Sequence, residues 1–361
     1  MPLLKQFKAD DYSTESFTTT YGFFDGGLGQ LSGGSLDSSS LAAGQTEYYV
    51  NLQYNSKDHF SIAYGNFNGS GSTDTVGQTK AVYRQFSNYL LNPNEQDDIG
   101  FVFSGSAIES NRVNDVFFLT AERLQMKDRL NKKNWTLQMT GSNTAGTAGI
   151  LLHLSDNSAY EVPYASPAGP RYNVISASAG DKGNNSLATV FGHFYPNVGV
   201  IALDGNQLSS SLPGTGSDAA NSDLINSAQK DGFGVLNRSV SSGAPGVNNI
   251  LKMMDCISTA GDDTGRATNI THTFRSEEIV TNNAYFCRAK AKEYNYTNNP
   301  TFSSGSNNSF TNPSFVTSPT TYISEVGLYN KNQDLIAVAK LSAPIEKTFS
   351  KEAAIKITLS Y

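Results

Sequence analysis

The sequence predicts a mainly β protein with β-sandwich or barrel-like antiparallel sheets, one or two helices and long loops. Runs rich in β-branched and aromatic residues recur between turns rich in Gly, Ser and Asn. A helical spacing of apolar residues appears in only two short windows. The chain is 38% apolar and 16% charged, a composition that allows a buried core. Since no fixed-period repeat is visible, solenoids and propellers are disfavoured.

The charge balance and the apolar pattern exclude several classes of protein. The 26 Lys and Arg against 32 Asp and Glu give a net charge of −6, whereas a protein that coats nucleic acid carries a strongly basic face. No window approaches the roughly 18 apolar residues of a membrane span, and the N-terminus lacks the apolar region of a secretory signal. We therefore expect assembly in the cytoplasm, with neither nucleic acid nor membrane as a partner.

The first expected segment is a loop-rich arm with strands over residues 1–75. Within it, residues 47–67 predict two strands joined at residues 55–58. A β-rich domain is expected over residues 76–208, and it opens with a helix near residues 78–92. The apolar stripe of that helix follows a spacing of i, i+4, i+7 and i+8, and Asn92-Pro93 ends it; its members are Val82, Phe86, Tyr89 and Leu90.

Three further stretches of this domain predict strands. Residues 115–142 predict a strand, a polar connection or short helix, and a strand built on Trp135, Leu137 and Met139. Residues 149–164 predict a strand pair around the turn at residues 155–158. Residues 193–208 predict an apolar strand that stops at Asp204-Gly205.

The remaining chain divides into a loop excursion and a C-terminal β domain. The excursion, residues 209–267, is expected to hold short helices, one near residues 218–229 and one marked by Ile250, Met254 and Ile257. The C-terminal β domain, residues 268–361, contains five β-like runs and a loop at residues 297–314.

The chemically active residue types form no recognisable catalytic pattern. The histidines, at positions 59, 153, 193 and 272, have no metal-ligand spacing, and no phosphate-binding loop or nucleophile elbow is present. Cys256 and Cys287 are expected as free thiols, with a disulfide as the alternative. We therefore expect no catalytic residue, no cofactor and no metal ligand. Whether the turn at residues 261–266 binds a cation stays open.

Basic residues form one notable pattern. Arg288, Lys290 and Lys292 occupy alternate positions, which on a strand places three cations on one face. Such a stripe suits an acidic protein neighbour, and a solvated strand face is the alternative.

The last residues, 321–361, predict a hairpin followed by a final strand. Tyr322 to Tyr329 is the first strand, residues 330–334 are the turn, and Leu335 to Leu341 is the antiparallel return. Gly327 lies inside the first strand, where glycine indicates a bulge or a close backbone approach. In the final strand Ala353, Ile355, Ile357 and Leu359 alternate with residues on a polar face. Its open edge suits β-augmentation by another subunit, and a closed sandwich without a partner there is the alternative.

This C-terminal block also resembles a known family. The run TYISEVGLYN followed by DLIAVAKLS resembles a recurring segment of bacteriophage tail proteins. The whole ending is similar to that of virion structural (tail or baseplate) proteins of large contractile-tailed bacteriophages, cyanophage-type myophages included. Residues 79–91, 134–139 and 284–302 resemble the same family. The similarity in the ending is carried by Gly327, Leu328, Tyr329, Asn330, Leu335, Ala337, Val338, Ala339, Lys340, Leu341, Ser342, Pro344, Lys347, Phe349, Glu352, Ala353, Ile355, Ile357 and Leu359.

The resemblance implies a structural role and supplies no catalytic residue. It implies a virion tail context without specifying the position in the particle. Our leading hypothesis is a baseplate component that joins the tail tube or wedges to neighbouring subunits or fibres, as a ring-like homo-oligomer. Its partners would be tube, wedge, sheath or fibre subunits. A neck or collar component and a host-binding fibre or carbohydrate-binding module are the alternatives. From the C-terminal pattern we expect interface residues at Tyr322, Gly327, Leu328, Tyr329, Ile355, Ile357 and Tyr361.

Overall fold

A computed structural model gives the architecture of the chain. By its contacts the chain divides into two compact units: Met1–Thr18 with Ile279–Tyr361, called the terminal unit below, and Thr19–Glu278, the central unit. The structure describes residues 4–24, 29–38, 49–69, 77–96, 99–105, 107–142, 149–178, 189–212, 249–250, 253–254, 256–258, 270–296, 300–304 and 306–361.

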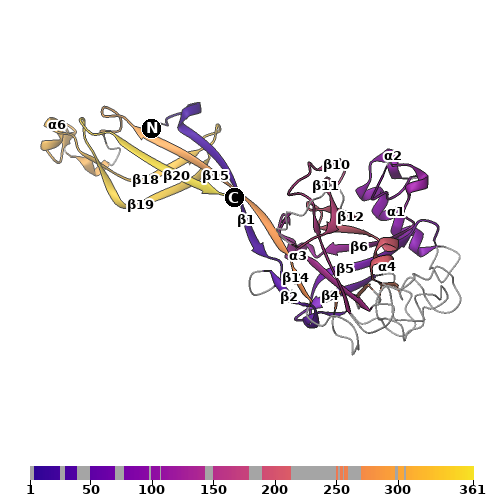
Figure 1. Cartoon of the computed structure of the whole chain (residues 1–361). Coiled ribbons are helices and arrows are strands. Elements are labelled where there is room, and N and C mark those ends of the chain that lie inside the picture. Colours follow the sequence, from indigo (N-terminus) through magenta and orange to yellow (C-terminus); the bar gives the residue numbers. More distant parts are fainter. Residues whose placement is uncertain are drawn as a thin grey trace. The chain divides into compact units, whose positions relative to one another are not determined.

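An antiparallel sheet that curls into a half-barrel forms the body of the central unit (Figure 1). Its strand order is β3-β4-β5-β6-β13-β12-β11-β9-β8, and β10 pairs with β11. The strands are β3 Asp37–Ser38, β4 Tyr49–Tyr54, β5 Lys57–Asn66, β6 Asp115–Ala121, β8 Leu137–Ser142, β9 Gly149–Asp156, β10 Tyr164–Ser166, β11 Gly169–Ser176, β12 Val190–Tyr195 and β13 Val200–Asp204.

Shorter elements complete the central unit. Strand β2, Gln30–Ser32, pairs with β14, Thr271–Thr273, and β7, Arg129–Leu130, pairs with the start of β15. The helices and 3-10 turns are α1 Gln78–Leu90, α2 Pro93–Gln96, α3 Arg123–Met126, α4 Gly205–Ser211, η2 Gly33–Ser35 and η3 Glu109–Asn111.

The middle strands of this sheet are buried on both faces. In β6, Phe117 and Leu119 belong to the larger core cluster, whereas Val116 and Phe118 belong to a second cluster that includes residues of α1. The ring of Phe86 on α1 stacks on Phe118 at a centroid distance of 4.0 Å. Burial on both sides explains why β6 and β13 are continuous apolar runs in the sequence.

Helix α1 forms where the sequence predicts it, but its predicted apolar stripe is wrong at Tyr89. That side chain is 53% exposed, whereas Tyr83, outside the predicted stripe, is fully buried. Tyr83 is accommodated because its hydroxyl donates to the Val113 carbonyl at 3.0 Å and accepts from the Phe101 N–H at 2.7 Å. Burial also raises the pKa of the Tyr83 hydroxyl.

The predicted strand pair at residues 47–67 is the hairpin β4–β5. Asn55 and Ser56 join the strands, and both have left-handed backbone angles, with φ of 51° and 60°. Two consecutive left-handed residues match the right-handed twist of the flanking strands, as in a type I′ turn.

Most other strand predictions in the central unit are confirmed. Residues 115–142 contain β6, α3 and β8 in the expected order. The strand expected before Asp204 is β13, and the Asp204 side chain also caps α4 by accepting from the backbone N–H groups of Asn206 and Gln207. The helical stripe of Ile250, Met254 and Ile257 packs on the larger core. The predicted helix near residues 218–229 and the turn at residues 261–266 lie outside the described residues.

The second strand predicted within residues 149–164 is wrong. After β9 the chain turns, and regular strand structure resumes only with β10 at Tyr164. The partner of β9 on that side is β11, and Asn157 supports this pairing because its N–H donates to the Asn173 carbonyl and its Oδ1 accepts from the Asn173 N–H, both at 3.0 Å. A polar side chain that bonds a distant strand therefore replaces the expected local return.

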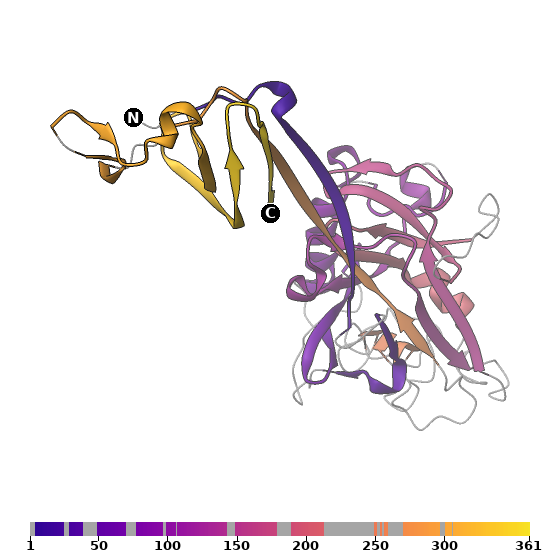
Figure 2. The ribbon, with the colours of Figure 1, turned by 90° about the vertical axis from the view of Figure 1, so that its left-hand side faces the viewer.

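The terminal unit is a small two-layer β structure. One layer has the strand order β1-β15-β20, and the other is the hairpin β18–β19. Strands β1 and β15, which run side by side in Figure 2, each continue from one unit into the other. The elements are η1 Ala9–Asp11, β1 Tyr12–Gly22, β15 Arg275–Ala289, η6 Pro300–Phe302, β16 Ser303–Ser304, β17 Ser309–Phe310, α6 Ser314–Thr317, β18 Thr321–Tyr329, β19 Leu335–Lys347 and β20 Ala353–Ser360.

The predicted fold class, mainly β with antiparallel sheets, is confirmed. In the structure, residues 1–18 belong to the same compact unit as the C-terminal strands. The sequence pattern instead predicts an N-terminal arm and a C-terminal β domain as separate segments. The reason is that β1 pairs with β15, a partner far away in the sequence. Within the described ranges, no helix is long and apolar enough to cross a membrane.

Candidate functional site

The hairpin β18–β19 forms as the C-terminal pattern predicts. Gly327 lies opposite Val338 and Tyr329 lies opposite Leu335. The turn is closed by Asn330 and Asp334: the Asn330 N–H donates to the Asp334 carbonyl at 3.0 Å, and the Asp334 N–H donates to the Asn330 side chain at 2.8 Å. The short polar side chain of Asn330 thus fixes the register of the strands.

The inner face of the hairpin makes the core of the terminal unit. Leu328 is buried with Ile355 and Ile357 of β20. These residues alternate with exposed ones, so each strand contributes one apolar face. The partly buried residues that pack around this core are Tyr285, Cys287, Ile323, Val326, Ala337, Ala339, Leu341, Ile345 and Leu359.

The opposite side of the hairpin is exposed, and large apolar side chains gather on it near the turn. Farther along, the exposed Glu325 lies opposite Lys340, and Tyr322 lies beyond this charged pair. Five large side chains on it have exposed fractions between 44% and 66%. Single exposed apolar residues are ordinary, but several on one short hairpin indicate an interaction surface. We call these five residues the outer hairpin face: Tyr322, Tyr329, Leu335, Ile336 and Val338.

Gly327 lies within this face and is covered by two of its side chains. A Cβ added to Gly327 would lie 3.0 Å from the Tyr329 ring and 3.2 Å from the Leu335 side chain. The close approach expected at this glycine is therefore made by side chains, and the register shifts lie on either side of it. Glycine allows Tyr329 and Leu335 to lie flat across the strand.

The structure divides the seven predicted interface residues into two groups. Tyr322, Gly327, Tyr329 and Tyr361 are exposed. Leu328, Ile355 and Ile357 instead point into the core of the terminal unit. The interface role of the exposed group stays a prediction.

Sequence reasoning did not select Leu335, Ile336 and Val338 as interface residues. The signal was present in the run LIAVAK, where Leu335 and Ile336 are adjacent and Val338 lies between two alanines. A strand with one solvated face would carry polar residues at every second position. In β19 the outward positions Lys340, Ser342 and Glu346 follow this rule, whereas Leu335, Ile336 and Val338 near the turn do not, which indicates a surface to be covered at that end of the hairpin.

The strand edges of the other layer are open among the described residues. Strand β20 pairs with β15 on one side, and no described strand pairs with its other side. Tyr361, next to β20, exchanges backbone hydrogen bonds with Thr281 at 2.9 and 3.1 Å, so the chain end is held in place. An ordered, unpaired edge of this kind is a template for another strand.

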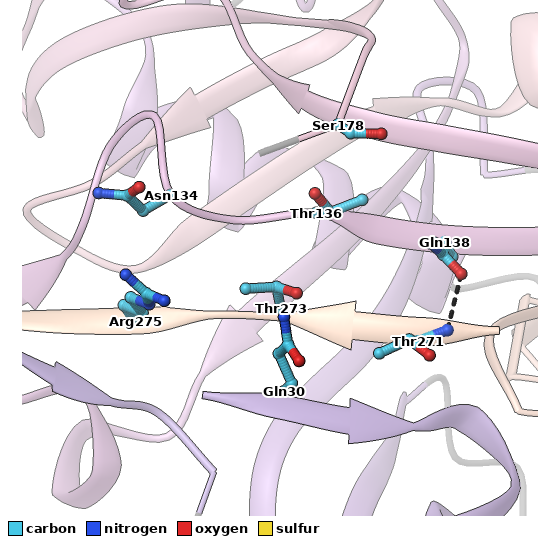
Figure 3. A pocket seen from close by; sticks show the side chains of 8 residues that line it. All are labelled: Gln30, Asn134, Thr136, Gln138, Ser178, Thr271, Thr273 and Arg275. Carbon is cyan, nitrogen blue, oxygen red and sulfur yellow. Dashed lines mark hydrogen bonds between the residues drawn. The ribbon is translucent and has the colours of Figure 1, made fainter. Parts of the chain in front are cut away.

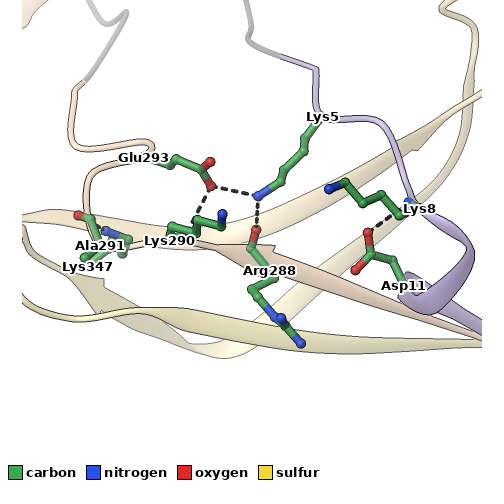
Figure 4. Close-up of polar contacts among 8 residues, drawn as sticks. All are labelled: Lys5, Lys8, Asp11, Arg288, Lys290, Ala291, Glu293 and Lys347. Carbon is green, nitrogen blue, oxygen red and sulfur yellow. Dashed lines mark hydrogen bonds and ion pairs between the residues drawn. The ribbon is translucent and has the colours of Figure 1, made fainter.

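The predicted cationic stripe is wrong for two of its three residues. Strand β15 ends at Ala289, so Lys290 and Lys292 lie in the turn that follows, and only Arg288 has a strand position. The turn is fixed by Lys5, whose Nζ donates to the Glu293 carboxylate and to the Arg288 carbonyl, both at 2.8 Å (Figure 4). The hydrogen bond from Lys5 lowers the pKa of Glu293.

A buried lysine holds the other side of the same turn. The Lys347 side chain, seen beside Ala291 in Figure 4, is fully buried. Its Nζ donates to the Ala291 carbonyl, the Asn295 side chain and the Thr348 carbonyl at 2.7–3.1 Å. Three acceptors compensate for removing the ammonium group from water. Lys347 therefore has a structural role within the unit.

The residues with catalytic or metal-binding potential are dispersed. Among the described residues, no group of three or more His, Cys, Asp or Glu side chains could hold a metal ion. Cys256 and Cys287 are free thiols, as expected. Burial raises the pKa of the Cys287 thiol.

Comparisons with protein-family models, with curated proteins and with solved structures each found no match. The resemblance of residues 321–361 to phage tail proteins therefore stays a prediction from the sequence. The geometry of the terminal unit is the basis for a functional proposal.

Proposed function

We propose that this chain is a non-enzymatic structural subunit of a contractile-tailed phage virion, located in the baseplate. There it joins the tail tube or wedges to neighbouring subunits or fibres. The observation that carries the proposal is the outer hairpin face, which is built from the same C-terminal block that resembles phage tail proteins.

The size of this face favours a repeated assembly over a single pairing. Its five side chains are about half exposed, and fully burying a large apolar side chain contributes about 1.5–3 kcal/mol. Covering the face thus contributes roughly 5 kcal/mol, whereas association costs about 4–15 kcal/mol. One such contact is marginal, but copies arranged in a ring make each contact part of a multivalent whole.

The open edge of β20 supports the same proposal. Its backbone groups suit the addition of a strand from a tube, wedge, sheath or fibre subunit. Lys356, exposed on this strand, disfavours indiscriminate edge pairing because its charge must be accommodated. A specific partner strand can place an acidic group beside it.

Matched substitutions of valine test the proposal. Val338→Asp places a carboxylate in the outer hairpin face, and Val316→Asp makes the same change at an exposed position of α6 in the same unit. Incorporation into particles is measured by quantitative mass spectrometry, and hydrogen exchange confirms that both variants fold. We expect Val338→Asp to reduce incorporation at least about tenfold, because a carboxylate buried without a partner costs more than about 1.4 kcal/mol.

The control Val316→Asp should be incorporated normally. Normal incorporation of Val338→Asp would contradict the proposed interface.

Labelled copies at the neck instead of the baseplate would favour a neck or collar component. Binding of the isolated chain to host cells, without affinity for tail proteins, would favour a host-binding module. Turnover of a cell-envelope polymer would contradict the non-enzymatic role.

A further inference from the structure

The layer β1-β15-β20 of the terminal unit has two open edges among the described strands. Strands β1 and β20 lie on either side of β15, and no described strand pairs with the far side of either one. Strand β1 is 11 residues long, yet ten of them are exposed and none is buried. A long exposed edge strand is a template for another strand, so these edges suit an assembly in which both are covered.

Hydrogen bonds between side chains fix how the three strands lie beside each other. Thr14 Oγ1 donates to the Asn283 side chain at 2.8 Å, and the hydroxyl oxygens of Ser16 and Thr281 lie 3.2 Å apart. Thr14 thus lies opposite Asn283, and β1 runs antiparallel to β15. On the other side of β15, Asn283 lies opposite Leu359 of β20. Because β1 and β20 are both antiparallel to β15, they run in the same direction.

The same register shows which backbone groups point to the open edges. Thr281 and Tyr361 exchange both backbone hydrogen bonds, and in an antiparallel pair such residues alternate with ones whose groups point away. Every second residue of β20, Lys356 and Thr358 among them, therefore directs its N–H and C=O to the open edge. Since Thr281 uses its backbone groups on β20, Ser16 opposite it directs its own groups away from β15, and so does every second residue of β1.

The two edges carry opposite charges on the same face of the layer. Leu359 packs against the core of the terminal unit. Lys356, three positions before it, points to the other face, where its Nζ lies 5.8 Å from the centroid of the Phe286 ring. Thr14 shares the inner face with Leu359, so Glu15 next to it points to the outer face as well. Glu15 and Lys356 are both exposed.

A shift between neighbouring copies brings these two charges together. Within one copy Lys356 is level with Asp11, which precedes β1. A shift from residue 11 to residue 15 places Lys356 of one copy opposite Glu15 of the next, and it places Ala353 opposite Tyr12, so that β20 follows β1 from its first residue. Because the shift is even, the side-chain faces and the outward backbone groups of the two strands stay matched.

The size of the shift is also that of a closed sheet. Its length along the strand is about 13 Å, and three strands are about 14 Å wide. These two lengths correspond to a strand tilt of about 42°, and closed sheets have tilts of about 35–45°.

We propose that the open edge of β20 pairs with β1 of the next copy of this chain, in parallel and head to tail. The inference rests on the proposed function, because it names the strand that covers the edge described there. A contact between opposite edges of one molecule is heterologous, and its repetition by rotation closes a ring. Lys356 then lies between Phe286 of its own sheet and Glu15 of the neighbouring copy.

Sedimentation equilibrium of the full chain tests the pairing. We expect the natural chain to self-associate below about 1 mM. Thr358→Pro removes an N–H at the open edge and keeps the pairing with β15, so it should weaken association at least about tenfold. Thr358→Val, the matched control, keeps the N–H and should associate as the natural chain does. Hydrogen exchange in β15 confirms that the terminal unit of each variant folds.

Charge reversal locates the contact. Glu15→Lys and Lys356→Glu should each weaken association about fivefold, because like charges then lie opposite each other. The double variant should restore association. Within one copy the two residues are two strands apart and offset by about 13 Å along the strands, so restoration reports pairing between copies.

Three results would each overturn the inference: a natural chain that stays monomeric up to about 1 mM, unchanged association of Thr358→Pro, or a double variant that associates as weakly as the single ones. Failure here is distinguishable from failure of the proposed function, because incorporation of Val338→Asp into particles tests the outer hairpin face and does not depend on the edge of β20.

Discussion

Acidification should destabilise the central unit through His272. This side chain is almost fully buried, and its two nitrogens have fixed partners: Nε2 donates to the Ile257 carbonyl at 2.8 Å, and Nδ1 accepts from the Gln138 N–H at 3.3 Å. A proton on Nδ1 would place two donors against each other. Burial accordingly lowers the pKa of His272 from 6.5 to about 4.

The magnitude follows from the linkage between proton binding and folding. Because the folded state has the lower pKa, the unfolded state binds more protons at acidic pH, and the free energy of unfolding falls as the pH drops below 6.5. At 1.36 kcal/mol for each pKa unit, the loss is about 2 kcal/mol at pH 5 and about 3 kcal/mol at pH 4. It is complete slightly below pH 4, where both states are protonated.

Urea unfolding followed by fluorescence measures this loss. Trp135 is the single tryptophan, it is buried, and its ring stacks on Phe274 at 5.5 Å, so its signal reports on the central unit. The free energy of unfolding is measured from pH 7 to pH 4 for the natural chain and for His272→Gln, which cannot titrate. The variant should lose about 2 kcal/mol less than the natural chain between pH 7 and pH 5.

The comparison of variants removes the contribution of other groups. Burial raises the pKa values of Asp156 and Asp204, and these carboxyl groups favour the folded state as the pH falls, in both proteins alike. Thr273→Val, next to His272 and without a titrating group, should keep the pH dependence of the natural chain. If His272→Gln and the natural chain lose stability in parallel, His272 is not buried in its neutral form and the reasoning is refuted.

Three further substitutions test the packing. Lys347→Met should destabilise the terminal unit by about 2–3 kcal/mol, since it leaves three partly buried acceptors without their donor. The same change at the exposed Lys351 should cost less than about 0.5 kcal/mol, and hydrogen exchange in β19 compares the two variants. Gly192→Ala should prevent a soluble fold, because its Cβ would lie 2.0 Å from a carbonyl oxygen of β13. The test is the yield of soluble protein and, for any soluble protein, an unfolding curve followed by Trp135 fluorescence. Tyr64→Phe removes the 2.8 Å hydrogen bond to buried Asp115 and should lower the free energy of unfolding by about 1–3 kcal/mol in urea. Unchanged hydrogen exchange for Lys347→Met, or an unchanged unfolding midpoint for either of the other two variants, would contradict the contact that is tested.

Local chemistry of the chain determined many elements. The alternation of residues 353–360 gave the strand β20 with one buried face, and Asn55 and Ser56 gave the turn between β4 and β5. The sequence also contained the alternation of Thr271, Thr273 and Arg275 (Figure 3) with the buried His272 and Phe274. Such features follow from side-chain period and turn preference, and both act between residues a few positions apart.

Only the tertiary structure decided which faces are covered. Leu328 and Val338 are both apolar residues of one hairpin, yet Leu328 is buried with residues of β20 and Val338 is 50% exposed. Tyr83 displaced Tyr89 from the buried face of α1 because two distant backbone groups satisfy its hydroxyl. The pairing of β1 with β15 joins opposite ends of the chain. These outcomes depend on which strands meet in space, and a local pattern carries no information about a distant partner.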